Sequence, residues 1–93
     1  MRAFSITFDP GKRERTLAER GLDFADAAHI LAGPRFDFED LRKEYGERRI
    51  VTVGFLADRM VIVIWTRRGR GHHVISMRKA NDREQRRYAP FIR

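Results

Sequence analysis

Hydrophobic and polar residues alternate along several stretches of the chain, and this period of two residues is typical of half-buried β-strands. One further stretch, Met60–Trp65, is apolar throughout, as expected of a strand that is covered on both faces. The last strands follow one another closely, which favours a meander of three or four antiparallel strands. The predicted strands lie at residues 3–8, 36–38, 49–56, 60–65 and 72–78.

Two short helices are predicted between the first strand and the rest of the sheet. Asp9, which a proline follows, is placed to cap the first helix, and Gly21 is placed to end it. Asp23 is placed to cap the second helix, and Gly33 with the proline after it ends this helix. The second helix carries apolar residues at i, i+3, i+4 and i+7 spacing, which predicts one buried stripe: Phe24, Ala27, Ala28 and Leu31.

A third short helix is predicted near the C-terminus. Asn81 is placed to cap it, and Glu84 three residues later occupies the capping-box position. Pro90 should end this helix near Tyr88. The order of elements is therefore β-α-α, then the meander, then a C-terminal helix, and this order predicts an α+β fold.

Composition narrows the classes of protein to which the chain can belong. Its 93 residues suit a single domain spanning 1–93, and its formal net charge of +7 comes almost entirely from arginine. Basic, arginine-rich chains favour polyanionic partners such as RNA or DNA. The chain has no cysteine, no stretch of the roughly 18–20 apolar residues that cross a membrane, and no secretory h-region. We expect a cytoplasmic protein with no membrane contact.

The segment His72–Tyr88 carries the densest chemistry in the sequence. If its first part is a regular strand, His72, Ser76 and Arg78 point to one face and His73 to the other. An imidazole, a hydroxyl and a guanidinium on one face could bind a phosphodiester, the arginine by charge and the serine by a hydrogen bond. The alternative is an edge strand that presents its polar face to water.

Two more groups of residues are candidates, each with a plainer alternative. The basic loop Arg67–Gly71 could hold RNA phosphates, or it could be a solvated hairpin tip. Glu47 and Arg49 could reach the same face as Ser76, or they could form a surface ion pair. The histidines lack the spacing of a metal site, so we expect no metal and no cofactor. A histidine could still transfer protons during RNA cleavage.

The sequence resembles the BrnT family of ribonuclease toxins over nearly the whole chain. The resemblance is clearest at the C-terminal signature, where Ile75, Ser76, Arg78 and Ala80 precede Glu84 and Tyr88. The segments that match in order are Phe8-Asp9 with Lys12, Gly21–Ala27, Glu47 with Arg49 and Gly54, Met60–Thr66, and Ile75–Tyr88. The chain departs from the family at His73, where an arginine is common, and at Glu19-Arg20-Gly21, where the family usually has Lys-His-Gly.

The resemblance implies a RelE-like fold and an endoribonuclease that needs no metal and inhibits translation. It also implies a cognate antitoxin of ribbon-helix-helix type, with operator DNA bound only through the toxin–antitoxin complex. The RNA substrate would be mRNA, free or on the ribosome. We assign catalytic roles to Arg49, Arg67, Ser76, Arg78, Glu47 and His73, where Glu47 or a histidine moves protons. We assign RNA binding to Lys12, Arg68, Arg70, His72, Arg83, Arg87 and Tyr88.

A second hypothesis is a non-catalytic basic module that binds nucleic acid or an acidic partner, including a degenerate toxin retained for antitoxin binding. Residue dependence separates the two hypotheses. A binding module loses affinity roughly in proportion to the arginines removed and depends strongly on salt. An enzyme loses turnover at one or two positions while it still binds RNA.

Overall fold

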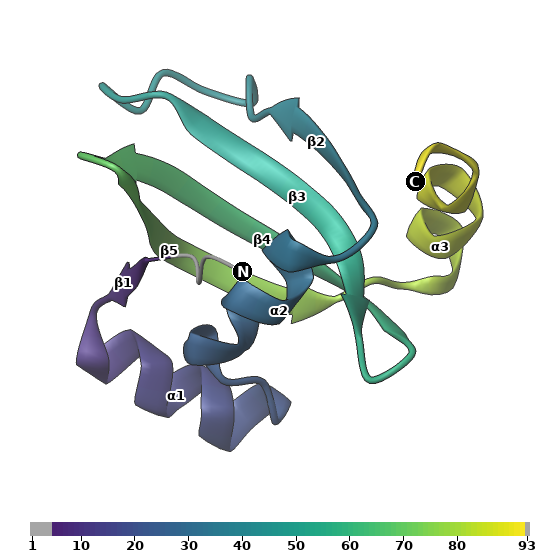
Figure 1. The fold of residues 1–93 in the computed structure, drawn as a ribbon, viewed down its shortest axis with the longest axis horizontal. Coiled ribbons are helices and arrows are strands. Elements are labelled where there is room, and N and C mark those ends of the chain that lie inside the picture. The colour runs from purple at the N-terminus through teal and green to yellow at the C-terminus, as the bar shows by residue number, and fades with distance from the viewer. Residues whose placement is uncertain (1–4, 93) are drawn as a thin grey trace.

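A five-stranded mixed sheet organises the chain, with its strands in the order β1-β5-β4-β3-β2 (Figure 1). The computed structural model describes residues 5–92. The strands are β1 (Ile6–Phe8), β2 (Arg35–Glu39), β3 (Arg49–Leu56), β4 (Arg59–Arg68) and β5 (Gly71–Lys79). The helices are α1 (Pro10–Arg20), α2 (Ala27–Ala32) and α3 (Asp82–Tyr88), and short 3-10 helices lie at Phe24–Asp26 and Ala89–Phe91.

Strands β2 to β5 form a four-stranded antiparallel meander, which confirms the predicted α+β class and the order of the elements. The edge strand β1 is different, because it runs parallel to β5 and places Ile6 beside His72. Parallel neighbours require a long crossover connection, and here the intervening helices and the meander provide it. The predicted beginning of this strand, with Phe4, lies outside the described residues.

Both predicted N-terminal helices form, and local hydrogen bonds explain where the first begins and ends. The Asp9 carboxylate accepts a hydrogen bond from the Lys12 N–H at 3.1 Å, and Gly21 ends α1 in the left-handed region with φ 68°. The second predicted helix begins with a 3-10 turn before α2. This tighter turn shifts the helical phase, so Ile30 is buried where the sequence pattern placed Ala28.

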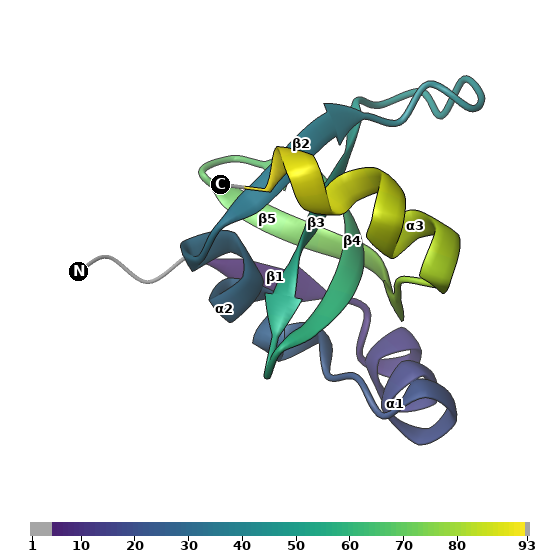
Figure 2. The same ribbon diagram turned by 90° about the vertical axis from the view of Figure 1, so that its right-hand side faces the viewer.

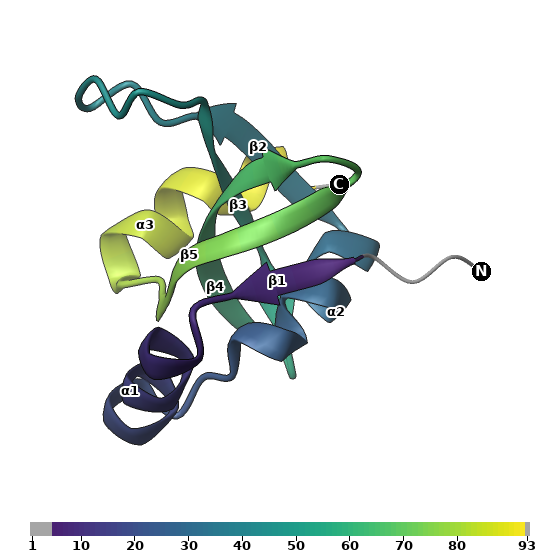
Figure 3. The same cartoon turned by 90° about the vertical axis from the view of Figure 1, so that its left-hand side faces the viewer.

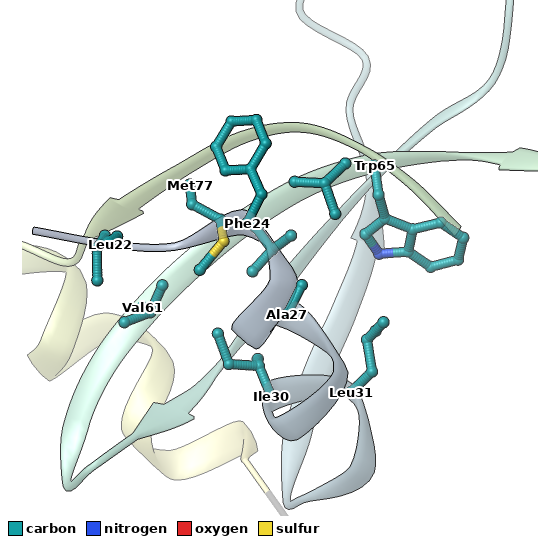
Figure 4. Close-up of a cluster of buried hydrophobic side chains, with 10 residues drawn as sticks. Leu22, Phe24, Ala27, Ile30, Leu31, Val61, Trp65 and Met77 are labelled. Carbon is teal, nitrogen blue, oxygen red and sulfur yellow. The ribbon is translucent and has the colours of Figure 1, made fainter. Parts of the chain in front are cut away.

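Hydrophobic side chains pack on both faces of the sheet in two clusters. Figures 2 and 3 show α3 on the opposite side of the sheet from α1 and α2. The cluster beneath α1 and α2 is drawn in Figure 4 and contains Leu22, Phe24, Ala27, Ile30, Leu31, Val61, Val63, Trp65, Val74 and Met77. The cluster beneath α3 contains Val51, Val53, Met60, Ile62 and Ala80, with Phe38, Ile64, Tyr88 and Ile92 packed against it.

A β-bulge in β5 changes which side chains share a face. Ile64 lies opposite Ser76 while Trp65 lies opposite Val74, so one residue of β5 is left between these two pairs. The extra residue breaks the alternation, and Val74 and Met77 therefore pack in the same cluster although they are three positions apart. The prediction that His72 lies in one row with Ser76 and Arg78 is wrong for this reason.

Candidate functional site

One row of polar side chains crosses the sheet on the face that α3 covers. Arg49 on β3 lies opposite Thr66 on β4, and Thr66 lies opposite His73 on β5. The row ends at the edge strand, where Thr7 Oγ1 lies 2.8 Å from His73 Nδ1. Directly paired residues present their side chains on the same face of a sheet, so the Arg49 guanidinium and the His73 imidazole share this face. Their strands are separated by β4, which puts the two backbones about 10 Å apart.

Ser76 and Arg78 lie further along β5 on this same face. Ser76 is paired with Ile64 and Arg78 with Ile62, and both isoleucines belong to the cluster beneath α3. The prediction that Ser76 and Arg78 share a face is therefore confirmed. The bulge also brings His73 to their side, although regular alternation placed it on the other side.

A groove opens beside Arg78 between α3 and the segment that follows β2. Its volume is about 260 Å³, and its floor is made by aliphatic side chains of β3 and β4. Charged residues from the neighbouring elements line its sides, so a phosphate at Arg78 could lie against an apolar floor. The lining residues are Phe38, Glu39, Asp40, Leu41, Arg42, Val51, Ile62, Ile64, Arg78, Glu84 and Tyr88.

The charge of Arg78 is matched by Glu84 on α3. Two guanidinium nitrogens of Arg78 donate to the two carboxylate oxygens of Glu84, at 2.7 and 2.6 Å. Hydrogen bonds from Arg78 lower the pKa of Glu84 to about 2. Glu84 also accepts the N–H of Asn81 at 3.0 Å, which completes the predicted capping box of α3. The site arginine and the C-terminal helix are thus joined by one carboxylate.

Arg49 is held by two residues from the segment between β2 and β3. Its guanidinium carbon lies 4.1 Å from the centre of the Tyr45 ring, and its Nε lies 3.6 Å from the Glu47 carboxylate. The same carboxylate is 3.6 Å from Arg68. The Tyr45 hydroxyl donates to Asp40 at 3.1 Å, which fixes the ring beneath Arg49.

Asp40 lies in the segment between β2 and β3 and is buried, with 6% of its surface exposed. Its carboxylate accepts hydrogen bonds from Arg42 and Tyr45 of the same segment. It accepts two hydrogen bonds from the Arg42 side chain, each at 2.8 Å, and these bonds hold the pKa of Asp40 well below its usual range. Sequence reasoning identified neither Asp40 nor Tyr45, because the segment showed only a polar, turn-like composition. The local signal for this contact in the sequence is the acidic residue Asp40 two positions before Arg42.

Comparison with protein families shows the family to which the chain belongs. Residues 8–84 match the family described as "Ribonuclease toxin, BrnT, of type II toxin-antitoxin system". The chain belongs to the BrnT family. The matched residues include Glu47, Arg49, Ser76, Arg78 and Glu84, while Thr7 at the end of the polar row and Tyr88 beside the groove lie outside the match. Membership in this family makes the chain a ribonuclease toxin that has an antitoxin partner. No curated protein matches the chain.

Two predicted site residues of this BrnT chain lie on the opposite face of the sheet. Arg67 pairs with His72, and its guanidinium lies 5.3 Å from the Trp65 ring, on the side of α1 and α2. His72 is 6% exposed, and its ring centre lies 4.5 Å from that of Trp65. Burial lowers the pKa of His72, and the positive charges of Arg67 and Arg35 lower it further. Grouping Arg67 with Arg49 and Arg78 is therefore wrong.

The other predicted RNA-binding residues of this BrnT chain lie in different places, and only Tyr88 among them lines the groove. Arg83, Arg87 and Tyr88 lie on α3, and Tyr88 stacks on Phe38 with ring centres 5.6 Å apart. Arg68 contacts Glu47 at the end of β4, and Arg70 is exposed in the turn before β5. Lys12 lies on α1, on the other side of the sheet from α3 (Figure 2).

Residues 5–92 contain no group of three histidine, aspartate or glutamate side chains placed to hold a metal ion. In the same part of the chain, no helix is long and apolar enough to cross a membrane.

Proposed function

We propose that the chain is a RelE-like endoribonuclease that cleaves cytoplasmic RNA without a metal ion. The observation that carries the proposal is the polar face beneath α3, where Arg49 on β3 and Ser76 and Arg78 on β5 lie on either side of β4, with Arg78 lining the groove. In the proposed reaction, a ribose 2′-OH attacks the adjacent phosphorus. A new O–P bond forms, the bond to the 5′-oxygen breaks, and a 2′,3′-cyclic phosphate remains.

Arginines supply the largest stabilisation in this proposal. Negative charge grows on the nonbridging oxygens as the attack proceeds, and fixed guanidinium groups stabilise it without reorganisation. Arg78 would bind these oxygens from β5 and Arg49 from β3, while the Ser76 hydroxyl positions the phosphate. Arg68 takes the place in the site that the sequence suggested for Arg67, since it contacts Glu47 on the correct face.

A proton carrier is also needed, and the candidates are Glu47 and His73. Glu47 lies between Arg49 and Arg68, so its carboxylate is already paired with two cations. His73 contacts Thr7 through Nδ1, which orients the ring and makes Nε2 the nitrogen that would exchange protons. The geometry favours His73 for taking the 2′-OH proton. A water or the protonated His73 would then supply the proton to the 5′-oxygen.

Regulation would follow the pattern of type II pairs. A ribbon-helix-helix antitoxin would bind and neutralise the toxin, and the complex would bind operator DNA through the antitoxin. Cleavage of mRNA, free or on the ribosome, would inhibit translation. The family match supports an antitoxin partner in general. The type of antitoxin and the effect on translation belong to this proposal.

The decisive experiment is cleavage of RNA in EDTA by the wild-type protein beside Arg78→Ala and Arg59→Ala. Arg59 is an exposed arginine at the start of β4, so its variant controls for lost positive charge. We expect cleavage by wild type and Arg59→Ala, and a loss of at least 100-fold in Arg78→Ala, the range typical of one electrostatic contact. Equal activity in all three, or no cleavage of either naked RNA or translated mRNA, overturns the proposal. No cleavage by any of the three proteins, together with an RNA affinity that falls similarly in Arg78→Ala and Arg59→Ala, would instead favour the non-catalytic module.

A further inference from the structure

Four aromatic rings meet beside the groove, between β2 and the C-terminal helices. The Phe36 and Phe91 rings are stacked with centres 5.1 Å apart, and the Phe38 and Tyr88 rings are stacked with centres 5.6 Å apart. These rings line a cavity of about 340 Å³, and Arg87 lies at its edge. Figure 2 shows the C-terminal segment crossing over β2 at this place.

This aromatic pocket is open to solvent, unlike the aromatic core on the other face. Phe91 is 55% exposed, whereas Phe24 beneath α2 is 0% exposed. Phe36, Phe38 and Tyr88 are half-buried, so Phe91 is the strongly exposed ring at the mouth of the pocket. The cavity volume is also within the range of small-ligand pockets, which begins at about 300 Å³. The pocket therefore fits a ligand the size of a ring with its attached sugar.

The pocket adjoins the proposed cleavage groove. Phe38 and Tyr88 line both cavities, so a ligand bound at Arg78 needs to pass only this pair of rings to reach Phe91. A single-stranded nucleic acid has the matching pattern, because it alternates phosphates with flat bases whose π-faces stack on aromatic rings. Arg87, whose guanidinium carbon lies 5.8 Å from the Tyr88 ring centre, adds a cation at the rim.

We infer that the aromatic pocket formed by Phe36, Phe38, Tyr88 and Phe91 binds one unpaired base of the RNA next to the phosphate at Arg78. The inference rests on the proposed function and specifies its substrate as single-stranded RNA. In a duplex the bases remain stacked on one another, so the pocket discriminates against double-stranded RNA. Tyr88 and Phe91 lie beyond residues 8–84, so the family match does not include this wall of the pocket.

Phe91→Ala is the first test, with Phe91→Trp as the rescue and Phe55→Ala as the matched control. Phe55 is a similarly exposed phenylalanine, at 42%, on β3 next to the β3–β4 turn. The probe is a fluorescent single-stranded RNA of twelve nucleotides whose 2′-OH groups are methylated, so that binding is measured without cleavage. Loss of one base–aromatic stack predicts roughly 5- to 150-fold weaker binding for Phe91→Ala. Phe91→Trp should restore binding, and Phe55→Ala should change it by less than twofold.

A base-removal experiment assigns the effect to one nucleotide. The same oligonucleotide is made with a single abasic site at each position in turn. At the position that occupies the pocket, the abasic probe should weaken binding to wild type but not weaken binding to Phe91→Ala any further. The slope of log affinity against log salt should be the same for both proteins, since Phe91 contacts no phosphate.

The outcomes separate this inference from the proposed function. Cleavage that persists in wild type while Phe91→Ala binds the probe as tightly as wild type overturns the base pocket and keeps the enzyme. Phe91-dependent binding without any cleavage keeps the pocket and overturns the enzyme. Weaker binding of Phe91→Ala to the antitoxin with unchanged binding to RNA also overturns the inference and makes the aromatic pocket a protein-docking surface.

Discussion

Replacing Glu84 with glutamine removes the negative charge that faces Arg78 and keeps the size of the side chain. The amide oxygen can still accept the Asn81 N–H, so the cap of α3 is preserved. The change therefore isolates the ion pair, in which the two carboxylate oxygens accept from Arg78 at 2.7 and 2.6 Å. We expect two consequences of opposite sign, a less stable protein and tighter binding of RNA.

The cost in stability follows from the geometry and exposure of the pair. Hydrogen bonds to charged groups contribute about 1.5–3 kcal/mol, while fully exposed ion pairs contribute less than about 1 kcal/mol. The side chains here are 44% exposed for Arg78 and 18% exposed for Glu84, so solvent screens part of the attraction. We expect a loss of about 1–2 kcal/mol in the free energy of unfolding, or a fall of roughly 5–15 °C in Tm.

The dependence of this loss on pH identifies the carboxylate as its cause. The Glu84 pKa is about 2 in the folded protein against 4.5 for the ordinary group, so the folded state holds the ionised form. Its contribution is complete above pH 4.5 and disappears as the pH falls toward 2. The difference in stability between wild type and Glu84→Gln should therefore be largest at neutral pH and shrink through this window. Glu14→Gln on the exposed face of α1 serves as the control.

RNA binding should change in the other direction. Without Glu84 the Arg78 guanidinium has lost its counter-charge and can neutralise one more phosphate. For single-stranded RNA, one added phosphate contact steepens the salt dependence of log affinity by about 0.7. Equilibrium titrations of a non-cleavable oligonucleotide at several salt concentrations measure this slope. If Glu84→Gln is as stable as wild type at pH 7 and its slope is unchanged, Glu84 does not compete with RNA for Arg78.

Three further predictions concern stability. In Gly54→Ala the new Cβ would lie 2.8 Å from a methyl carbon of α2, so urea denaturation should show a loss of about 1–3 kcal/mol, whereas Gly11→Ala in α1 should not. Thr52→Val leaves the buried Trp65 indole N–H without its 2.8 Å acceptor and should cost about 1–3 kcal/mol in the same assay. Because the pKa of His72 is lowered from 6.5, the unfolded chain takes the proton more readily. Thermal stability should fall as the pH drops below 6.5, and His72→Gln should reduce that dependence.

Features set by neighbouring residues could be predicted from the sequence. The caps of α1 and α3 are local, since Asp9 and Asn81 bond to N–H groups three residues away. The four strands of the meander follow from alternation and from the apolar run at 60–65. The parallel pairing of β1 with β5 could not be predicted in this way, because it joins Ile6 to His72 across most of the chain. Nothing in either segment marks the other as its partner.

The candidate site depends on one such non-local feature. Regular alternation along β5 would put His73 on the face of α1 and α2 and leave His72 beside Ser76 and Arg78. Which residue is left unpaired in a bulge depends on how β4 and β5 twist against each other and on what packs below them. Here Val74 and Met77 both fill the core beneath α1 and α2, and His73 then joins Ser76 and Arg78 on the face of α3. The bulge thus decides which histidine lies on the face of the proposed cleavage site.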